Sequence, residues 1–496
     1  MVRSPLRRSL KGSLPAIRRH VSMTATQPKR EGDISDAFAS MSQADLAPLP
    51  DIFRQLKVNL VKGREAAIEQ SWRRLLRELR RENEIIAQRG PGVIPQVECS
   101  DLKRSIGEKE EEIRKRGVVV VKGVIPEAEA RAYKTEVEDY VRRNPWTRAA
   151  FPAHDPQVYE LYWSPPQVRA RAHPSFTQVQ QLLMARLWHT SPETQLSMST
   201  PFSYADRLRI RQPGDASFAL GPHMDGGSVE RWEPEGFGRG GVYDEILAGQ
   251  WESYDAWDAS GRVDAVTNRY EGIGPCSAFR MWQGWMSMSR SGPGQGTLLV
   301  YPLVKHAAAY TLLRPFFRPV VAAAAERGAE GFLEEGNWRM MSVEEMNSDL
   351  QGAVPGKGLE YTEEWHPHLE LGQCMVHVPD IKPGDYVAWH CDTIHAVDKV
   401  HAGTQDSSVM YIPICPVTEQ NAAYMVRQRE AFRQGAPGPD FGGGEGEARH
   451  EGRLGEGDLA RLRGLRAMGM QRLEVREGMR RGEREVVERA NRVLGF

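Results

Sequence analysis

The first part of the chain alternates between helical and strand-like hydrophobic patterns. In residues 65–87, apolar side chains recur every three or four positions among Arg and Glu, which predicts an amphipathic helix that ends at Gly90-Pro91-Gly92. The valine-rich run at residues 116–125 predicts a buried strand, and a helix should extend from Pro126 to about residue 144. A further helix is expected at residues 175–189.

From about residue 204 to 416 the pattern changes to short apolar runs separated by glycine and proline. This texture favours an all-β barrel or sandwich over alternating strands and helices. An acidic, helical insertion near residues 314–364 interrupts the strands and could cover the mouth of the barrel. The expected strands are residues 208–211, 279–289, 297–300, 386–389 and 409–414.

These patterns divide the chain into four parts. We expect a disordered basic segment at residues 1–45, a helical and strand region at 46–200 packed on the barrel, the barrel itself at 201–416, and a helical extension at 417–496. The first 30 residues contain eight Arg or Lys and no acidic residue. That composition fits a mitochondrial transit peptide, a disordered basic tail or a start at Met23, so we expect an intracellular protein, cytoplasmic or mitochondrial.

Composition narrows the class of partner. The chain has 496 residues and a formal net charge of −1, which offers no basic face for nucleic acid or an anionic membrane, so a small molecule is the expected partner. Its five cysteines are widely spaced and form no Cys-x-x-Cys pair, which is typical of reduced intracellular thiols. No apolar run approaches the roughly 20 residues that span a bilayer, and we expect a soluble protein.

One pair of residues suggests metal chemistry. His223 and Asp225 are two positions apart, so on an extended strand both side chains point to the same face. A third ligand could come from residues 389–397, which contain His390 and His395. Two imidazoles and one carboxylate on one face of a metal leave open positions that suit Fe(II) oxygen chemistry. A His-x-Asp triplet is common by chance, and its context must decide.

The context resembles a known superfamily. Gly384-Asp385 followed by His395, downstream of His223-x-Asp225, is similar to the ligand order of the Fe(II)/2-oxoglutarate oxygenases, and residues 117–139 resemble the opening region of their phytanoyl-CoA-hydroxylase-like branch. More closely, several motifs resemble the YbiU-like family of bacteria and fungi, which carries a domain-of-unknown-function label. These motifs are residues 221–232, 279–285, 296–298, 313–316, 408–413 and 439–441.

The resemblance implies an α+β fold, a double-stranded β-helix (a cupin-like jelly-roll barrel) with flanking N- and C-terminal helices. It implies that His223, Asp225 and His395 hold Fe(II), with 2-oxoglutarate and dioxygen at the remaining positions, in a dioxygenase that hydroxylates or oxidises a small metabolite. The alternative is a barrel without turnover that binds a metal or metabolite, as a sensor or pseudoenzyme.

Other polar residues should lie around this site. His390 and Asp392 form a second His-x-Asp triplet, which we expect to face the substrate or to orient the ligands. Glu230, Arg231 and Trp232 follow the metal pair and either line the pocket or form a salt-bridged strand end.

The expected 2-oxoglutarate anchor departs from the branch it resembles. Those enzymes usually carry an arginine downstream of the distal histidine, at a position where this chain has Asp406. A buried carboxylate needs a cation or several donors, and a guanidinium can bind both oxygens. We expect Arg280, within an apolar stretch, to take this role. Its expected helpers are Arg211 and the hydroxyls of Ser408 and Tyr411.

Overall fold

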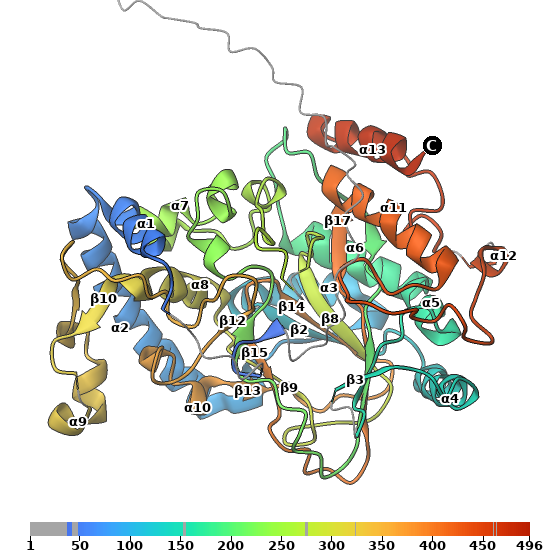
Figure 1. Cartoon of the computed structure of the whole chain (residues 1–496), viewed down its shortest axis with the longest axis horizontal. Coiled ribbons are helices and arrows are strands. Elements are labelled where there is room, and N and C mark those ends of the chain that lie inside the picture. The colour runs from blue at the N-terminus through green and yellow to red at the C-terminus, as the bar shows by residue number, and fades with distance from the viewer. Residues whose placement is uncertain are drawn as a thin grey trace, which may run out of the picture.

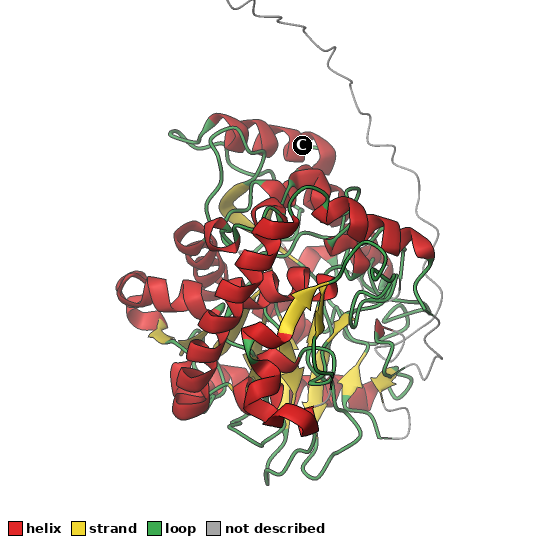
Figure 2. Cartoon of the chain, turned by 90° about the vertical axis from the view of Figure 1, so that its left-hand side faces the viewer, coloured by secondary structure: helices red, strands yellow, loops and turns green. Residues whose placement is uncertain are grey.

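The computed structural model of the chain describes residues 37–41, 48–151, 155–272, 276–322, 324–459, 461–462 and 464–496. Two sheets lie at its centre and helices surround them (Figures 1 and 2), so the expected mixed α+β class is confirmed. Most of the expected basic segment, residues 1–36 and 42–45, lies outside the described residues.

The N-terminal helices follow the hydrophobic pattern. The helix predicted at residues 65–87 is α2 (Glu65–Arg89), and it buries Trp72 and Leu79 completely. It ends at Gly90, whose φ of 51° is one that glycine adopts readily. The next predicted elements are β2 (Val118–Lys122), α4 (Glu127–Arg143) and α6 (Pro174–Leu187), and the remaining helices here are α1 (Asp51–Val61), α3 (Leu102–Arg116) and α5 (Pro165–Arg171).

The larger sheet has the order β1-β2-β14-β8-β16-β6-β4-β3, with β17 pairing with β5 and β8. Valines 118–121 of β2 are all buried, which explains the unbroken apolar run. The strand expected at residues 409–414 is two strands, divided at Pro413, which has no N–H for a ladder. The strands are β1 (Gln96–Glu98), β3 (Ala149–Phe151), β4 (Val158–Tyr159), β5 (Ser197–Ser203), β6 (Leu208–Arg211), β8 (Trp282–Ser287), β14 (Tyr386–His390), β16 (Ser407–Tyr411) and β17 (Ile414–Val417).

The smaller sheet has the order β12-β7-β15-β9-β13. The chain moves back and forth between the two sheets: β6, β8, β14 and β16 belong to the larger one, and β7, β9, β13 and β15 to the smaller one. This alternation places the two sheets around a shared interior. The smaller sheet consists of β7 (His223–Met224), β9 (Leu298–Val300), β12 (Leu359–Glu360), β13 (Val376–His377) and β15 (His395–Val397).

The predicted insertion packs beside α2. Its short strands pair with each other, and Phe317 stacks on Trp72 with ring centroids 4.5 Å apart. Contrary to the expectation that this segment covers the barrel mouth, no described residue of 314–364 lines the central cavity. The elements in and around it are α8 (Val304–Leu313), β10 (Phe317–Pro319), α9 (Ala324–Leu333), β11 (Trp338–Met340) and α10 (Leu371–Cys374), and α7 (Asp244–Leu247) lies earlier in the chain.

The C-terminal extension is helical at both ends. The helix predicted at residues 421–434 is α11 (Glu419–Gln434), which α13 (Arg481–Leu494) contacts (Figure 1). Between them lie the short α12 (Glu456–Leu459) and a long irregular segment that includes Asp440 and Phe441. The proposed division of the chain at residues 200 and 416 stays a prediction.

Residues 37–41 depart from the expectation that the chain is disordered up to residue 45. Phe38 and Ala39 are buried, and Phe38 packs with Val158, Phe218 and Leu220. The carbonyl of Ala37 accepts a hydrogen bond from the Gly358 amide at 2.8 Å. These five residues therefore belong to the folded core, because they bury an aromatic side chain and pair their backbone.

Candidate metal centre

A cavity of about 140 Å³ lies between the two sheets. Strands of both sheets line it, and residues from the two ends of the chain complete its wall. Its polar lining includes two histidines, four carboxylates and three arginines, and several aromatic rings enclose the rest. These residues are His223, His395, Glu160, Asp206, Asp225, Asp440, Arg207, Arg209, Arg280, Phe38, Tyr204, Trp285, Trp389, Tyr411 and Phe441.

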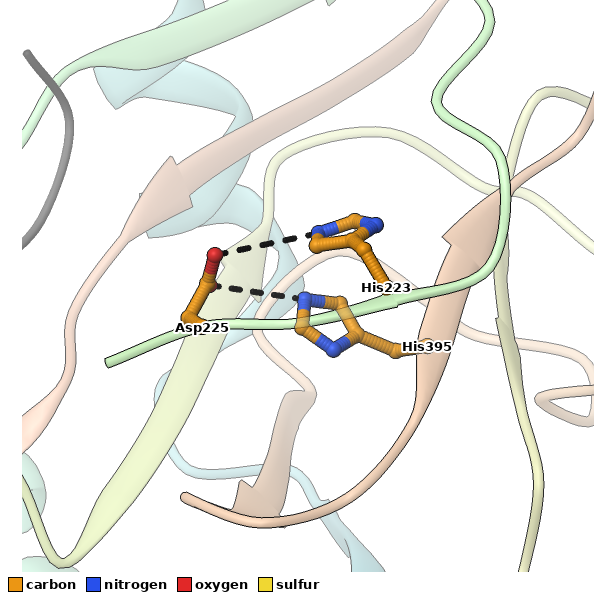
Figure 3. Close-up of side chains that lie close together, drawn as sticks. All are labelled: His223, Asp225 and His395. Atoms are coloured by element: carbon orange, nitrogen blue, oxygen red, sulfur yellow. Dashed lines mark ion pairs between the residues drawn. The ribbon is translucent and has the colours of Figure 1, made fainter. Parts of the chain in front are cut away.

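The structure brings His223, Asp225 and His395 together. His223 opens β7 and His395 opens β15, and these two residues are directly paired across the smaller sheet. Both rings point toward Asp225 (Figure 3), and their Nε2 atoms lie 3.9 Å and 3.6 Å from its two carboxylate oxygens. The candidate ligand atoms all lie within 4.8 Å of one another. Residues 172 positions apart in sequence thus converge because β7 and β15 are neighbours.

Both imidazoles are held with Nε2 toward the carboxylate. Nδ1 of His223 lies 2.7 Å from the carbonyl of Gly221, and Nδ1 of His395 lies 3.0 Å from the carbonyl of Thr393. A carbonyl can only accept, so each Nδ1 carries a proton and each Nε2 is directed toward the carboxylate of Asp225. Hydrogen bonds of this kind fix the tautomer and ring orientation of metal-bound histidines.

The charge states also suit a metal. Burial and the neighbouring His223 lower the pKa of His395 to about 3, so its ring is neutral at physiological pH. Burial by itself would raise the pKa of Asp225, but His223, His395 and Arg280 outweigh it and lower the pKa below its ordinary value. A neutral imidazole and an ionised carboxylate are the forms that bind metal.

Arg231 supports the turn that carries Asp225. It is buried, and its guanidinium donates to the carbonyl of Asp225 at 2.8 Å and to Asp392 Oδ1 at 2.8 Å. Glu230 accepts from the amides of Ser228 and Arg269. The expectation that residues 230–232 line the pocket was therefore wrong, and the salt-bridge alternative describes Arg231.

His390 and Asp392 are core residues beneath the site. Nε2 of His390 lies 2.9 Å from the carbonyl of Ala256, and its Nδ1 accepts the amide of Asp392 at 2.9 Å, so both ring nitrogens have partners. Asp392 forms ion pairs with Arg231 and Arg262. Together with Cys391 these groups are close enough for a metal, but their partners leave them no free donor set. They neither face the cavity nor contact the candidate ligands directly.

Two of the four expected anchor residues are committed elsewhere. The guanidinium of Arg211 is fully buried and donates to Asp215 and to the carbonyls of Asp398 and Lys399. The hydroxyl of Ser408 donates to Asp406. Neither residue lines the cavity, so the expectation that they bind a co-substrate was wrong.

Arg280 and Tyr411 do line the cavity, and the structure adds residues that sequence reasoning did not select. Arg209, on the middle of β6, faces the cavity from the larger sheet. The rings of Phe38 and His223 pack edge to face with their centroids 4.7 Å apart. Asp440 and Phe441 line the cavity from the C-terminal extension. The 439–441 motif signalled the last two residues, whereas a five-residue segment around Phe38 carries no periodicity that could have revealed it.

In the described part of the chain, no helix is both long and apolar enough to span a membrane.

Fold and site together define a mixed α+β protein with a buried candidate metal centre between two sheets. A family model described as Gig2-like matches residues 47–470, and the chain belongs to this family.

Individual relatives agree with this membership. The chain is 33% identical over 395 residues to the "Uncharacterized protein YbiU" of Escherichia coli (strain K12), covering 77% of this chain and 86% of that protein. The crystal structure of GlcNAc Inducible Gene 2, GIG2 (DUF1479), from Candida albicans matches with a TM-score of 0.79 at 29% identity, covering 91% of this chain and 97% of the other. The hypothetical protein JW0805 from Escherichia coli matches with a TM-score of 0.71 at 32% identity, covering 86% and 99%. The expected resemblance to YbiU-like proteins is confirmed.

Proposed function

We propose that this protein is an Fe(II)- and 2-oxoglutarate-dependent oxygenase that oxidises a small molecule. The observation that carries the proposal is the arrangement of His223, Asp225 and His395, whose two Nε2 atoms face one carboxylate inside a buried cavity. Two imidazoles and one carboxylate form a ligand face typical of non-haem Fe(II) oxygenases.

The path of the chain supports the same proposal. Strands β6 to β9 and β13 to β16 alternate between sheets of order β6-β16-β8-β14 and β7-β15-β9-β13. We interpret this as a double-stranded β-helix, the jelly-roll barrel expected from the sequence, with the ligands on its smaller sheet. In such a barrel the interior is available for a ligand, which is where the cavity lies.

Fe(II) fits the donor set. His395 is neutral, both imidazoles have Nδ1 occupied by a carbonyl, and Asp225 is ionised. When bound, Fe(II) would supply the activation of dioxygen, coupled to the oxidative decarboxylation of 2-oxoglutarate to succinate and carbon dioxide. The protein's own contribution is to orient the three ligands, to line part of the cavity with the apolar rings of Trp285 and Trp389, and to bind the carboxylates that enter it.

2-Oxoglutarate is a dicarboxylate, and the cavity has guanidinium groups to receive it. Arg280 was expected from the sequence to bind its distal carboxylate, and Arg209 on β6 of the larger sheet is a second candidate. A guanidinium binds a carboxylate through two parallel hydrogen bonds, which is the strongest single contact available in a buried site.

The test combines metal content and turnover. Protein loaded with Fe(II) should bind about one iron per chain, as in a 2-His-1-carboxylate site, and should form succinate from 2-oxoglutarate in the presence of oxygen. His395→Ala should lose the iron, whereas His390→Ala and the exposed control His189→Ala should keep it. Iron binding without succinate formation would favour the alternative of a metal-binding barrel without turnover, and iron loss only in His390→Ala would show that the wrong distal histidine was chosen.

A further inference from the structure

Arg209 and Arg280 share one cavity, and both have hydrogen-bond donors that no described residue accepts. Arg209 is 3% exposed. Its Nη2 donates to the carbonyl of Gly296 at 2.9 Å, but its Nε is buried and has no acceptor among the described residues. A buried donor without an acceptor is costly, so a ligand that supplies the acceptor is expected.

Arg280 is less restrained. It lies above the ring of Tyr204 at 5.5 Å and forms no hydrogen bond or ion pair with any residue in the described ranges. The third arginine of the cavity, Arg207, differs because it pairs with Asp206 and Glu160. Arg280 therefore lines the cavity with donors that no described residue accepts.

The carboxylates near Arg280 already have other partners. Asp206 accepts from the amide and the guanidinium of Arg207. Asp440 accepts from the hydroxyl of Tyr204 at 2.9 Å and from Ser277. Asp225 belongs to the candidate metal ligands and accepts no hydrogen bond from Arg280. Within the described ranges, Arg280 thus has negative charge nearby but no direct acceptor.

Arg209 and Arg280 differ in how firmly the protein holds their side chains, and this difference suits two different ligands. Arg209 is rigid, because Gly296 and Ser407 fix one of its nitrogens, and it projects from a central position of β6. A fixed, fully buried cation suits a co-substrate that never varies. Arg280 is partly buried, just before β8 in sequence, and lies at the wall of the cavity that it forms with Tyr204, whose ring it covers. A less restrained cation at that wall suits the molecule that is oxidised.

We infer that Arg209 binds the distal carboxylate of 2-oxoglutarate and that Arg280 binds a carboxylate of the substrate, which is therefore an anionic small molecule. This inference rests on the proposed function, since it assigns one of the two carboxylates of 2-oxoglutarate to the metal and the other to Arg209. A carboxylate fits better than a phosphate, because one guanidinium matches its single charge and its two oxygens. The rings of Tyr204 and Phe441 would contact the apolar part of the substrate.

The test uses full-length protein loaded with Zn(II), so that binding is measured without turnover. 2-Oxoglutarate is titrated first by calorimetry. At saturating 2-oxoglutarate, the protein is then titrated with benzoate and, separately, with the uncharged isostere benzamide. Wild-type protein should bind benzoate at least about tenfold more tightly than benzamide, as a charge-assisted hydrogen bond predicts.

Substitution separates the two arginines. Arg280→Met should abolish the preference for benzoate while changing the Kd for 2-oxoglutarate by less than about threefold, and Arg280→Lys should restore part of the preference. Arg209→Met should raise the Kd for 2-oxoglutarate by at least about tenfold. The exposed Arg73→Met is the matched control and should change neither, because Arg73 pairs only with Glu69 on the surface of α2.

Three outcomes would overturn the inference: no preference for benzoate in the wild type, no binding of benzoate at all, or a preference that survives in Arg280→Met. A loss of 2-oxoglutarate affinity in Arg280→Met but not in Arg209→Met would show that the sequence expectation for Arg280 was right and the present assignment is wrong. If the wild type does not bind 2-oxoglutarate, the result counts against the proposed function instead. The role of Arg280 is then decided by titrating benzoate and benzamide into the protein that holds zinc but no 2-oxoglutarate.

Discussion

Replacing Arg231 should weaken metal binding although Arg231 is not a ligand. Its guanidinium is almost fully buried and joins three groups: the carbonyl of Asp225 at 2.8 Å, the Asp392 carboxylate at 2.8 Å and the Tyr243 hydroxyl at 2.6 Å. It thereby ties the turn that carries one candidate ligand to the core beneath the site. Arg231→Met removes these contacts while keeping a side chain of similar length.

The expected loss of stability in Arg231→Met depends on which partners Asp392 keeps. Removing one partner of a buried ion pair costs about 3–5 kcal/mol. Asp392 keeps Arg262 as a partner, so we expect a loss at the lower end, about 3 kcal/mol, in the free energy of unfolding. Loss of a group that orients a metal ligand typically lowers metal affinity about 10- to 100-fold, and we expect a change in this range.

Arg262→Met is the matched control. It removes the other guanidinium from the same carboxylate, but Arg262 contacts Tyr254 and Cys391 rather than the turn of Asp225. Unfolding by urea in excess EDTA measures stability, and competition against a chromophoric chelator measures the Kd for Zn(II). Both variants should be destabilised, and only Arg231→Met should lose affinity beyond about threefold. Equal affinities in the two variants would refute the reasoning that Arg231 acts through the position of Asp225.

Three further predictions concern stability. His390→Ala should lower the free energy of unfolding by about 3 kcal/mol, because its ring stacks on Trp188 at 4.6 Å, and metal titration should show unchanged stoichiometry. Removal of residues 1–36 should leave Tm unchanged, whereas removal of residues 1–41 should cost about 3 kcal/mol through the loss of buried Phe38; equal Tm values would contradict its packing. Burial raises the pKa of Glu447 to about 7, so the neutral acid is favoured in the folded state, and the stabilisation present at low pH is lost as pH rises through 7. Urea unfolding should therefore show wild type losing about 3 kcal/mol relative to Glu447→Gln between about pH 4 and 8, and parallel pH profiles would exclude this role.

The sequence predicted those parts of the site that depend on local spacing. His223 and Asp225 are two residues apart, and an extended backbone alone brings their side chains to one face. The choice of His395 over His390 came from the ligand order that the family resemblance implied, and the pairing of β15 with β7 in the structure places His395 beside His223. In the fold, the long helix α2 and the valine strand β2 were predictable because their apolar patterns are strong.

The roles of the arginines could not be predicted in the same way. Arg207 directly precedes β6, and Arg209 and Arg211 occupy alternate positions on it, so their spacing alone predicts one shared face. Their functions differ because of partners far away in sequence: carbonyls at residues 398 and 399 consume the donors of Arg211, while no described acceptor reaches Nε of Arg209. Which donors find an acceptor depends on the tertiary structure, so it cannot be predicted from the alternation of residues along a strand.

The ring of Phe38 packs on the ring of His223, yet Phe38 precedes residue 47, where the match to the family model begins. Part of the wall around the candidate ligands is thus formed by residues that lie outside the region matched by the family model. Substitutions in this short peptide could alter the shape of the cavity without changing either sheet or any metal ligand. Variation in this peptide would therefore reshape the wall beside His223 from outside the region that the family model matches.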